Sequence, residues 1–194
     1  MKEINSLNII CPGSWNKRIF TPAWVASNLF ELEKNEIEVA FNPAEMDMGY
    51  SYNNKVVLFP RDNSIEIKVN VIDEESKIFS VNLINKILSL LPQTPIRALG
   101  FNIRYVFKKD EDYPIVNRMN QIICNYDEFS TNQIKFSKEF DNYQLNLITE
   151  IKANEYIINF NFHHRLEHFP EEMIFDEEAI NKKIEETQNI INDE

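Results

Sequence analysis

Residues 156–164 read YIINFNFHH, and apolar and polar side chains alternate from Ile158 to His163. Successive side chains of an extended chain point to opposite faces. Ile158, Phe160 and Phe162 therefore fall on one face, while Asn159 and Asn161 fall on the other. This period of two predicts a half-buried β-strand whose apolar face packs on a core.

The same alternation recurs along the chain, in SIEIKVNV (64–71), ALGFNIRYVF (98–107) and EIEVAF (36–41). A short apolar run at 7–11 predicts another strand. Hairpins are predicted within 48–60 and 134–151, turning at Asn53-Asn54 and Asp141-Asn142. The side chains expected to face the core include Ile65, Ile67, Phe101, Ile103, Phe160 and Phe162.

Helical patterns lie between these strands. Asp73 opens the longest, to about Leu91, with acidic residues in its first turn, where the helix dipole favours them. Shorter helices are expected after Thr21-Pro22 and from Pro114, and a last one from about Asp176 to Ile191. The sequence thus predicts an α+β fold, a mainly antiparallel sheet of about eight strands with helices on one face.

The order of the predicted elements repeats itself. We expect a single compact α+β domain over residues 1–194, with pseudo-repeat halves 1–92 and 96–194 separated by Pro92 and Pro95. The halves share no evident residue identity, so the repeat rests on element order alone. The alternative is an ordinary α+β domain whose two meanders look alike by chance.

Composition narrows the function. The net charge of −11 disfavours nucleic acid, which needs a basic surface for its phosphates, and favours basic protein partners. Three glycines form no phosphate-cradling loop, so no nucleotide cofactor is expected. No apolar stretch approaches the ~20 residues of a spanning helix. Cys11 and Cys124 are more typical of buried thiols in a reducing compartment, which predicts a cytoplasmic protein.

All three histidines, His163, His164 and His168, fall within six positions. Residues 164–168 spell H-x-x-E-H, which is similar to the inverted zincin signature, in which both histidines bind zinc and the glutamate activates water. His164, Glu167 and His168 are metal candidates only if they are helical. In a strand, residues four apart lie roughly 13 Å from each other, at about 3.3 Å per residue, so one zinc ion cannot join them. We therefore expect a strand and no metal.

Four residues are candidates for binding a partner. His163 and Arg165 lie on the polar face of the predicted strand. Trp15 lies in a loop beside Lys17 and Arg18, and Trp and Arg are common interface anchors; the alternative is that it caps the core. Ile184 belongs to a narrow seam on the last helix, formed by Ile180, Ile184, Thr187 and Ile191. That seam predicts a homo-oligomer or partner contact, or else packing on the helix's own sheet.

Two E-x-K units, Glu66-Ile67-Lys68 and Glu150-Ile151-Lys152, lie on predicted strands. Restriction-like nucleases use such a unit with a preceding aspartate to hold magnesium, and Asp62 precedes the first. Both copies lie on strands in which polar and apolar residues alternate, which indicates a pattern of charged residues on an exposed strand face and not a catalytic motif.

These observations favour a non-enzymatic, acidic cytoplasmic protein that acts as an interaction or adaptor subunit, for example in toxin neutralisation or in a multi-protein assembly. The alternative is a metal-dependent hydrolase that uses the His163–His168 cluster.

Overall fold

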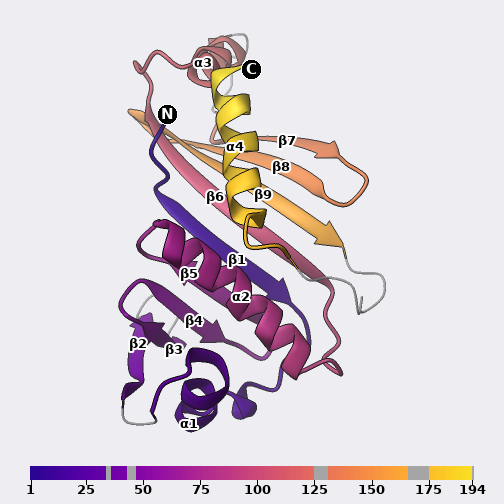
Figure 1. Ribbon diagram of the computed structural model, residues 1–194. Helices are drawn as coiled ribbons and strands as arrows, with labels where there is room; N and C mark the ends of the chain where they lie inside the picture. Colours follow the sequence, from indigo (N-terminus) through magenta and orange to yellow (C-terminus); the bar gives the residue numbers. More distant parts are fainter. Residues whose placement is uncertain (34–35, 43–46, 125–130, 166–174, 194) are drawn as a thin grey trace.

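The computed structural model describes residues 1–33, 36–42, 47–124, 131–165 and 175–193 (Figure 1). In these ranges nine strands form one antiparallel sheet. The strands are β1 (Ser6–Pro12), β2 (Glu38–Asn42), β3 (Asp47–Tyr52), β4 (Val56–Pro60), β5 (Ser64–Val69), β6 (Ala98–Lys108), β7 (Gln133–Glu139), β8 (Gln144–Ile151) and β9 (Glu155–Arg165). The helices are η1 (Lys17–Ile19), α1 (Pro22–Val25), η2 (Ala26–Phe30), α2 (Glu74–Leu90), α3 (Pro114–Cys124) and α4 (Ala179–Asn192).

The strands follow the order β2-β3-β4-β5-β1-β6-β9-β8-β7 across the sheet. The first five come from the N-terminal half of the chain and the last four from the C-terminal half. β1 and β6 pair at the centre of the sheet. β5, β4, β3 and β2 follow in order beyond β1, and β9, β8 and β7 follow in order beyond β6, so that each side is a meander. Two pseudo-repeat halves would produce this strand order. Whether the halves arose by duplication stays a prediction.

The helices lie on one face of the sheet, as the sequence predicts. Figure 1 shows α2 in front of β1 and β5, and α4 in front of β6 and β9. The sheet has nine strands, in line with the about eight expected, and the strand predicted at 36–41 is the edge strand β2, which pairs with β3. None of the described helices is long and apolar enough to cross a membrane.

The core fills the space between the sheet and these helices. Burial alternates strictly along β9, from Glu155 to Arg165. Its register with β6 places Phe162 beside Phe101 and Phe160 beside Ile103, and all four side chains are 0% exposed. The six side chains expected to face the core are all buried.

Local sequence signals fix several element ends. The Asp73 carboxylate accepts a hydrogen bond of 2.8 Å from the Ser76 backbone N–H and so caps α2. Asn53 and Asn54 both adopt positive φ, 51° and 56°, at the tip of the β3–β4 hairpin. Two such residues in a row suit the twist of a two-residue hairpin turn, and asparagine tolerates this conformation better than most residues.

Candidate functional site

The face of the sheet that turns away from α2 and α4 carries a row of hydrogen-bonded amides. Ser137 Oγ donates to Asn146 Oδ1 (2.7 Å), Asn146 Nδ2 to Asn161 Oδ1 (3.1 Å), and Asn161 Nδ2 to Asn102 Oδ1 (2.7 Å). These residues lie directly opposite one another on β7, β8, β9 and β6. The side chains of this row therefore hydrogen-bond to one another.

His163 and Arg165 differ from these asparagines. Both lie at the end of β9 on the same polar face, His163 half-buried and Arg165 exposed. Asn159, two steps of the alternation before His163, accepts a bond of 2.7 Å from Arg104 Nε. Within the described part of the chain, His163 and Arg165 form no hydrogen bond or ion pair through their side chains. Among the described residues, no group accepts a hydrogen bond from these two side chains, so their donors are available to another molecule.

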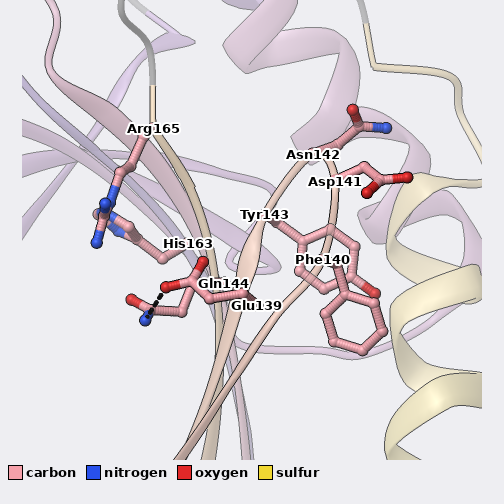
Figure 2. A pocket seen from close by; sticks show the side chains of 8 residues that line it. All are labelled: Glu139, Phe140, Asp141, Asn142, Tyr143, Gln144, His163 and Arg165. Atoms are coloured by element: carbon pink, nitrogen blue, oxygen red, sulfur yellow. Dashed lines mark hydrogen bonds between the residues drawn. The ribbon is translucent and has the colours of Figure 1, made fainter.

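A pocket of about 230 Å³ brings these two side chains beside the β7–β8 turn (Figure 2). Its lining consists of Glu139, Phe140, Asp141, Asn142, Tyr143, Gln144, His163 and Arg165. Gln144 Nε2 donates a 2.6 Å hydrogen bond to Glu139 Oε1, and Gln144 lies opposite His163 in the sheet. Figure 2 shows the rings of Phe140 and Tyr143 towards α4, away from His163 and Arg165. The pocket thus combines two basic side chains with the carboxylates of the turn.

His164 points to the other face and into the core, where it is 6% exposed. Its Nδ1 lies 3.1 Å from the backbone oxygen of Asn142. That oxygen can only accept, so Nδ1 carries the proton and donates. Burial, together with the nearby charge of Lys183, lowers the pKa of His164 to about 4. The side chain is therefore neutral near pH 7, and its Nε2 is a buried acceptor without a partner among the described residues.

Lys183 fixes α4 onto the sheet next to His164. Its Nζ lies 4.9 Å from the ring centres of Tyr143 and Phe162 and 5.1 Å from that of Phe101. A cation over aromatic faces is attracted by their quadrupoles. Burial lowers the pKa of Lys183. On the same side, Tyr143 donates its hydroxyl proton to Glu186, at 2.7 Å and 2.9 Å from its two oxygens.

The strand prediction at the histidine cluster is confirmed as far as Arg165. His163 and His164 are neighbours on a strand and point to opposite faces, so they do not converge on one ion. Glu167 and His168, the other candidates of the H-x-x-E-H string, lie outside the described residues. In the part of the chain that is described, no three His, Cys, Asp or Glu side chains form a group that could hold a metal ion.

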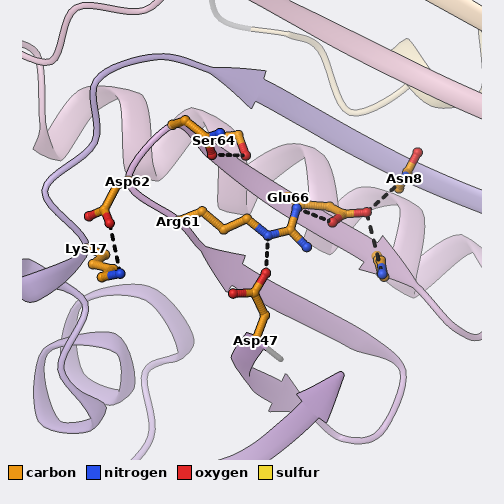
Figure 3. Close-up of polar contacts among 9 residues, drawn as sticks. Asn8, Lys17, Asp47, Arg61, Asp62, Ser64 and Glu66 are labelled. Atoms are coloured by element: carbon orange, nitrogen blue, oxygen red, sulfur yellow. Dashed lines mark hydrogen bonds and ion pairs between the residues drawn. The ribbon is translucent and has the colours of Figure 1, made fainter. Parts of the chain in front are cut away.

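The first E-x-K unit belongs to a network of ion pairs and hydrogen bonds (Figure 3). Glu66 is 5% exposed, and its oxygens accept from Asn8 Nδ2 at 2.9 Å and Arg61 Nη1 at 2.9 Å. Arg61 also pairs with Asp47 on β3. Asp62 instead pairs with Lys17 at 2.8 Å. These contacts tie β1, β3 and β5 together and, among the described residues, leave no carboxylate cluster for magnesium at Glu66.

The other two binding candidates lie in apolar surroundings. Trp15 is 4% exposed, and its Nε1 donates to the Cys11 backbone oxygen at 2.9 Å, as expected of a residue that caps the core. Ile184 is half-buried, between Ile180 and Ile191, which are fully buried against the sheet. The structure therefore brings together His163 and Arg165, and places Trp15 and Ile184 apart from them.

The sequence alone did not indicate Glu139, Asn142 or Gln144 as pocket residues. Their position depends on the register between β8 and β9, which sets Gln144 against His163. The one sequence signal for these pocket residues is the predicted turn at Asp141-Asn142, because it places the tip of the β7–β8 hairpin. Pairing partners of a strand cannot be read from its own alternation.

Comparison with protein-family models, with curated proteins and with solved structures finds no match for this chain.

Proposed function

We propose that this chain is a non-enzymatic interaction subunit that binds a protein partner at the pocket between the end of β9 and the β7–β8 turn. The observation that carries the proposal is that Arg165 and His163 face this pocket with no internal hydrogen bond or ion pair among the described residues. A guanidinium presents five donors in a fixed plane, which suits a carboxylate on a partner. Arginine is also enriched among the residues that dominate interface energies.

The two walls of the pocket carry opposite charge. Arg165 lies on one side, and Glu139 and Asp141 on the other. This arrangement suits a protein segment that has both an acidic and a basic side chain. At longer range, the net charge of −11 attracts a partner that is basic as a whole, and this attraction raises the rate of encounter more than the affinity.

We also propose a cytoplasmic location for this interaction. Both cysteines are free; Cys11 is buried in β1 as expected, whereas Cys124 is exposed at the end of α3, so the expectation that both thiols are buried is wrong for Cys124. Burial raises the pKa of the Cys11 thiol to about 12, so it stays protonated and unreactive. An exposed free thiol such as Cys124 persists best in a reducing compartment.

The experiment is a quantitative capture from the native host. The tagged wild type is compared with Arg165→Ala and with a matched control, Arg18→Ala, which removes another exposed arginine, in η1. We expect one protein to be recovered with the wild type and the control, and to be depleted at least tenfold with Arg165→Ala. Recovery of the same proteins in equal amounts with all three would contradict the proposal.

Metal analysis of the same purified samples addresses the hydrolase alternative. One equivalent of zinc that is lost in His164→Ala and His168→Ala would favour the hydrolase over the interaction subunit. We expect the capture result to depend on Arg165 and not on His164, because His164 points into the core.

A further inference from the structure

The strand β7 forms one edge of the sheet, and six of its seven residues are exposed. Phe140 N donates to Tyr143 O and Ile151 N to Asn132 O, both at 2.9 Å. Hydrogen-bonded pairs alternate along an antiparallel ladder, so the even-numbered residues of β7 bond to β8. Gln133, Lys135, Ser137 and Glu139 consequently turn their backbone N–H and C=O groups outward. This edge is ready to pair with another strand.

The side chains of this edge carry uncompensated charge. Lys135 and Glu139 are exposed on the same face, and neither forms an ion pair with a described residue. On the other face, Phe136 is 46% exposed, and Lys138 lies 4.8 Å from the ring centre of Phe140. Lys135 and Glu139 carry opposite charges and lie two residues on either side of Ser137. Two antiparallel copies of β7 can therefore set each lysine opposite the glutamate of the other copy.

We propose that two copies of this chain pair through β7, antiparallel, around a twofold axis at Ser137. Lys135 of each copy then lies opposite Glu139 of the other. On the second face, Phe136 lies opposite Lys138 of the other copy. Opposite charges and cation–aromatic pairs directly across a ladder each stabilise it. The two sheets become one sheet of eighteen strands, twice the nine of each chain.

Charge selects this register over its neighbours. Only registers centred on a residue keep the polar and apolar faces of the two sheets continuous. A centre at Phe136 would set Lys135 against Ser137 and Glu139 against Gln133, which leaves both charges uncompensated. A centre at Lys138 or at Lys135 would set that lysine against itself, which is destabilising.

The opposite edge fits a second copy less well. β2 offers Glu38 and no basic side chain, so no register of self-pairing within β2 sets opposite charges against each other. At β7, by contrast, pairing would place the second copy's Lys135 beside Glu139, which lines the pocket. The dimer does not depend on the proposed protein-binding role of that pocket, and each proposal has its own test.

The first test measures self-association of the full chain by sedimentation velocity over a range of concentrations. We expect a dimer, with a dissociation constant raised at least tenfold in Lys135→Glu and in Glu139→Lys. The double variant, Lys135→Glu with Glu139→Lys, exchanges the charges and should restore the dimer. Arg18→Glu makes the same charge change in η1 and should leave it intact. A wild type that stays monomeric, or a dimer insensitive to these changes, would overturn the proposal.

A second test reads the register in protein that keeps its fold. Residues of a hydrogen-bonded antiparallel pair have Cα atoms about 5.5 Å apart, within the range of a disulfide. In a Cys124→Ser background, Ser137→Cys should form a cross-linked dimer when diamide oxidises the two thiols, and Phe136→Cys should not. Cross-linking through position 136 in place of 137, or through neither, would refute the register. Circular dichroism melts confirm that each variant is folded.

Discussion

At the scale of single residues, His164 should make the fold sensitive to acid. Burial lowers its pKa from the ordinary value of 6.5, which holds in the unfolded chain, to about 4 in the folded protein. The unfolded chain therefore binds the proton first as the pH falls. The stabilisation from neutral His164 is fully present above pH 6.5 and is lost progressively down to about pH 4. The difference between the two pKa values corresponds to about 3 kcal/mol, at about 1.36 kcal/mol per pH unit.

The measurement is urea unfolding between about pH 4 and pH 7.5, with His164→Phe as the comparison. Phenylalanine keeps an aromatic ring among Phe101, Tyr143 and Phe175 but has no proton to bind. The free energy of unfolding of the variant should fall by about 3 kcal/mol less over this window than that of the wild type. Equal slopes in the two proteins would show that His164 is not buried as a neutral ring.

Phe160 tests the assignment of the apolar face of β9. The side chain is 0% exposed and lies against Tyr105, with the ring centres 5.8 Å apart. Phe160→Ala should lower the free energy of unfolding by about 3–5 kcal/mol, because it removes a large buried ring and leaves a cavity. Denaturant titration measures this value, and a loss below about 1 kcal/mol would mean that the face is misassigned.

At the scale of elements, the strands could be predicted more completely than their pairing. The alternation in residues 156–164 identified both faces of β9, and Asn53-Asn54 identified the first hairpin turn, because each signal lies within a few neighbouring residues. The contact between the β7–β8 turn and the end of β9 depends on pairing between segments remote in sequence. The pocket at Arg165 could therefore be only half predicted, through His163 and Arg165 and not through Glu139 or Gln144.

The seam on α4 shows the same limit. Its narrow spacing indicated either a contact with another chain or packing on its own sheet. Ile180 and Ile191 are fully buried against that sheet, and Thr187 Oγ1 lies 2.7 Å from the Tyr105 hydroxyl oxygen. The helical pattern alone could not show this, because the surface beneath the helix is built by β6, which lies far earlier in the chain.

The two isoleucines of the seam should respond differently to a charge. Ile180→Asp places a carboxylate in the core and should cost at least about 4 kcal/mol of the free energy of unfolding. Ile184 lines a cavity of about 520 Å³ with Lys2, Asn70 and Gln188. An aspartate there can reach water and should cost about 1–2 kcal/mol.

Thermal melts and light scattering on the same samples check this prediction. Ile184→Asp should remain folded, with its self-association unchanged. Loss of association in a fully stable Ile184→Asp variant would instead assign the seam to a contact between chains.

At the scale of the whole molecule, the two halves are joined by more than the central β1–β6 pair. Gln188 on α4 donates to the Lys2 backbone oxygen at 2.8 Å and to the Tyr105 hydroxyl at 3.2 Å. Lys77 on α2 donates to Asn181 on α4 at 2.5 Å. The helices of both halves thus contact each other above one sheet. This arrangement leaves the opposite face of the sheet free of helices α2 and α4 (Figure 1). Arg165 is the last residue of β9.

The most direct test of the interaction role is a calorimetric titration of the captured partner, purified, into wild-type chain, Arg165→Ala and Arg18→Ala. A central interface arginine contributes about 2 kcal/mol or more in typical cases, and each increment of about 1.4 kcal/mol is a factor of ten in Kd. We expect Arg165→Ala to weaken binding by about thirtyfold and Arg18→Ala to leave Kd unchanged. Equal Kd values for all three proteins would contradict a binding role for Arg165.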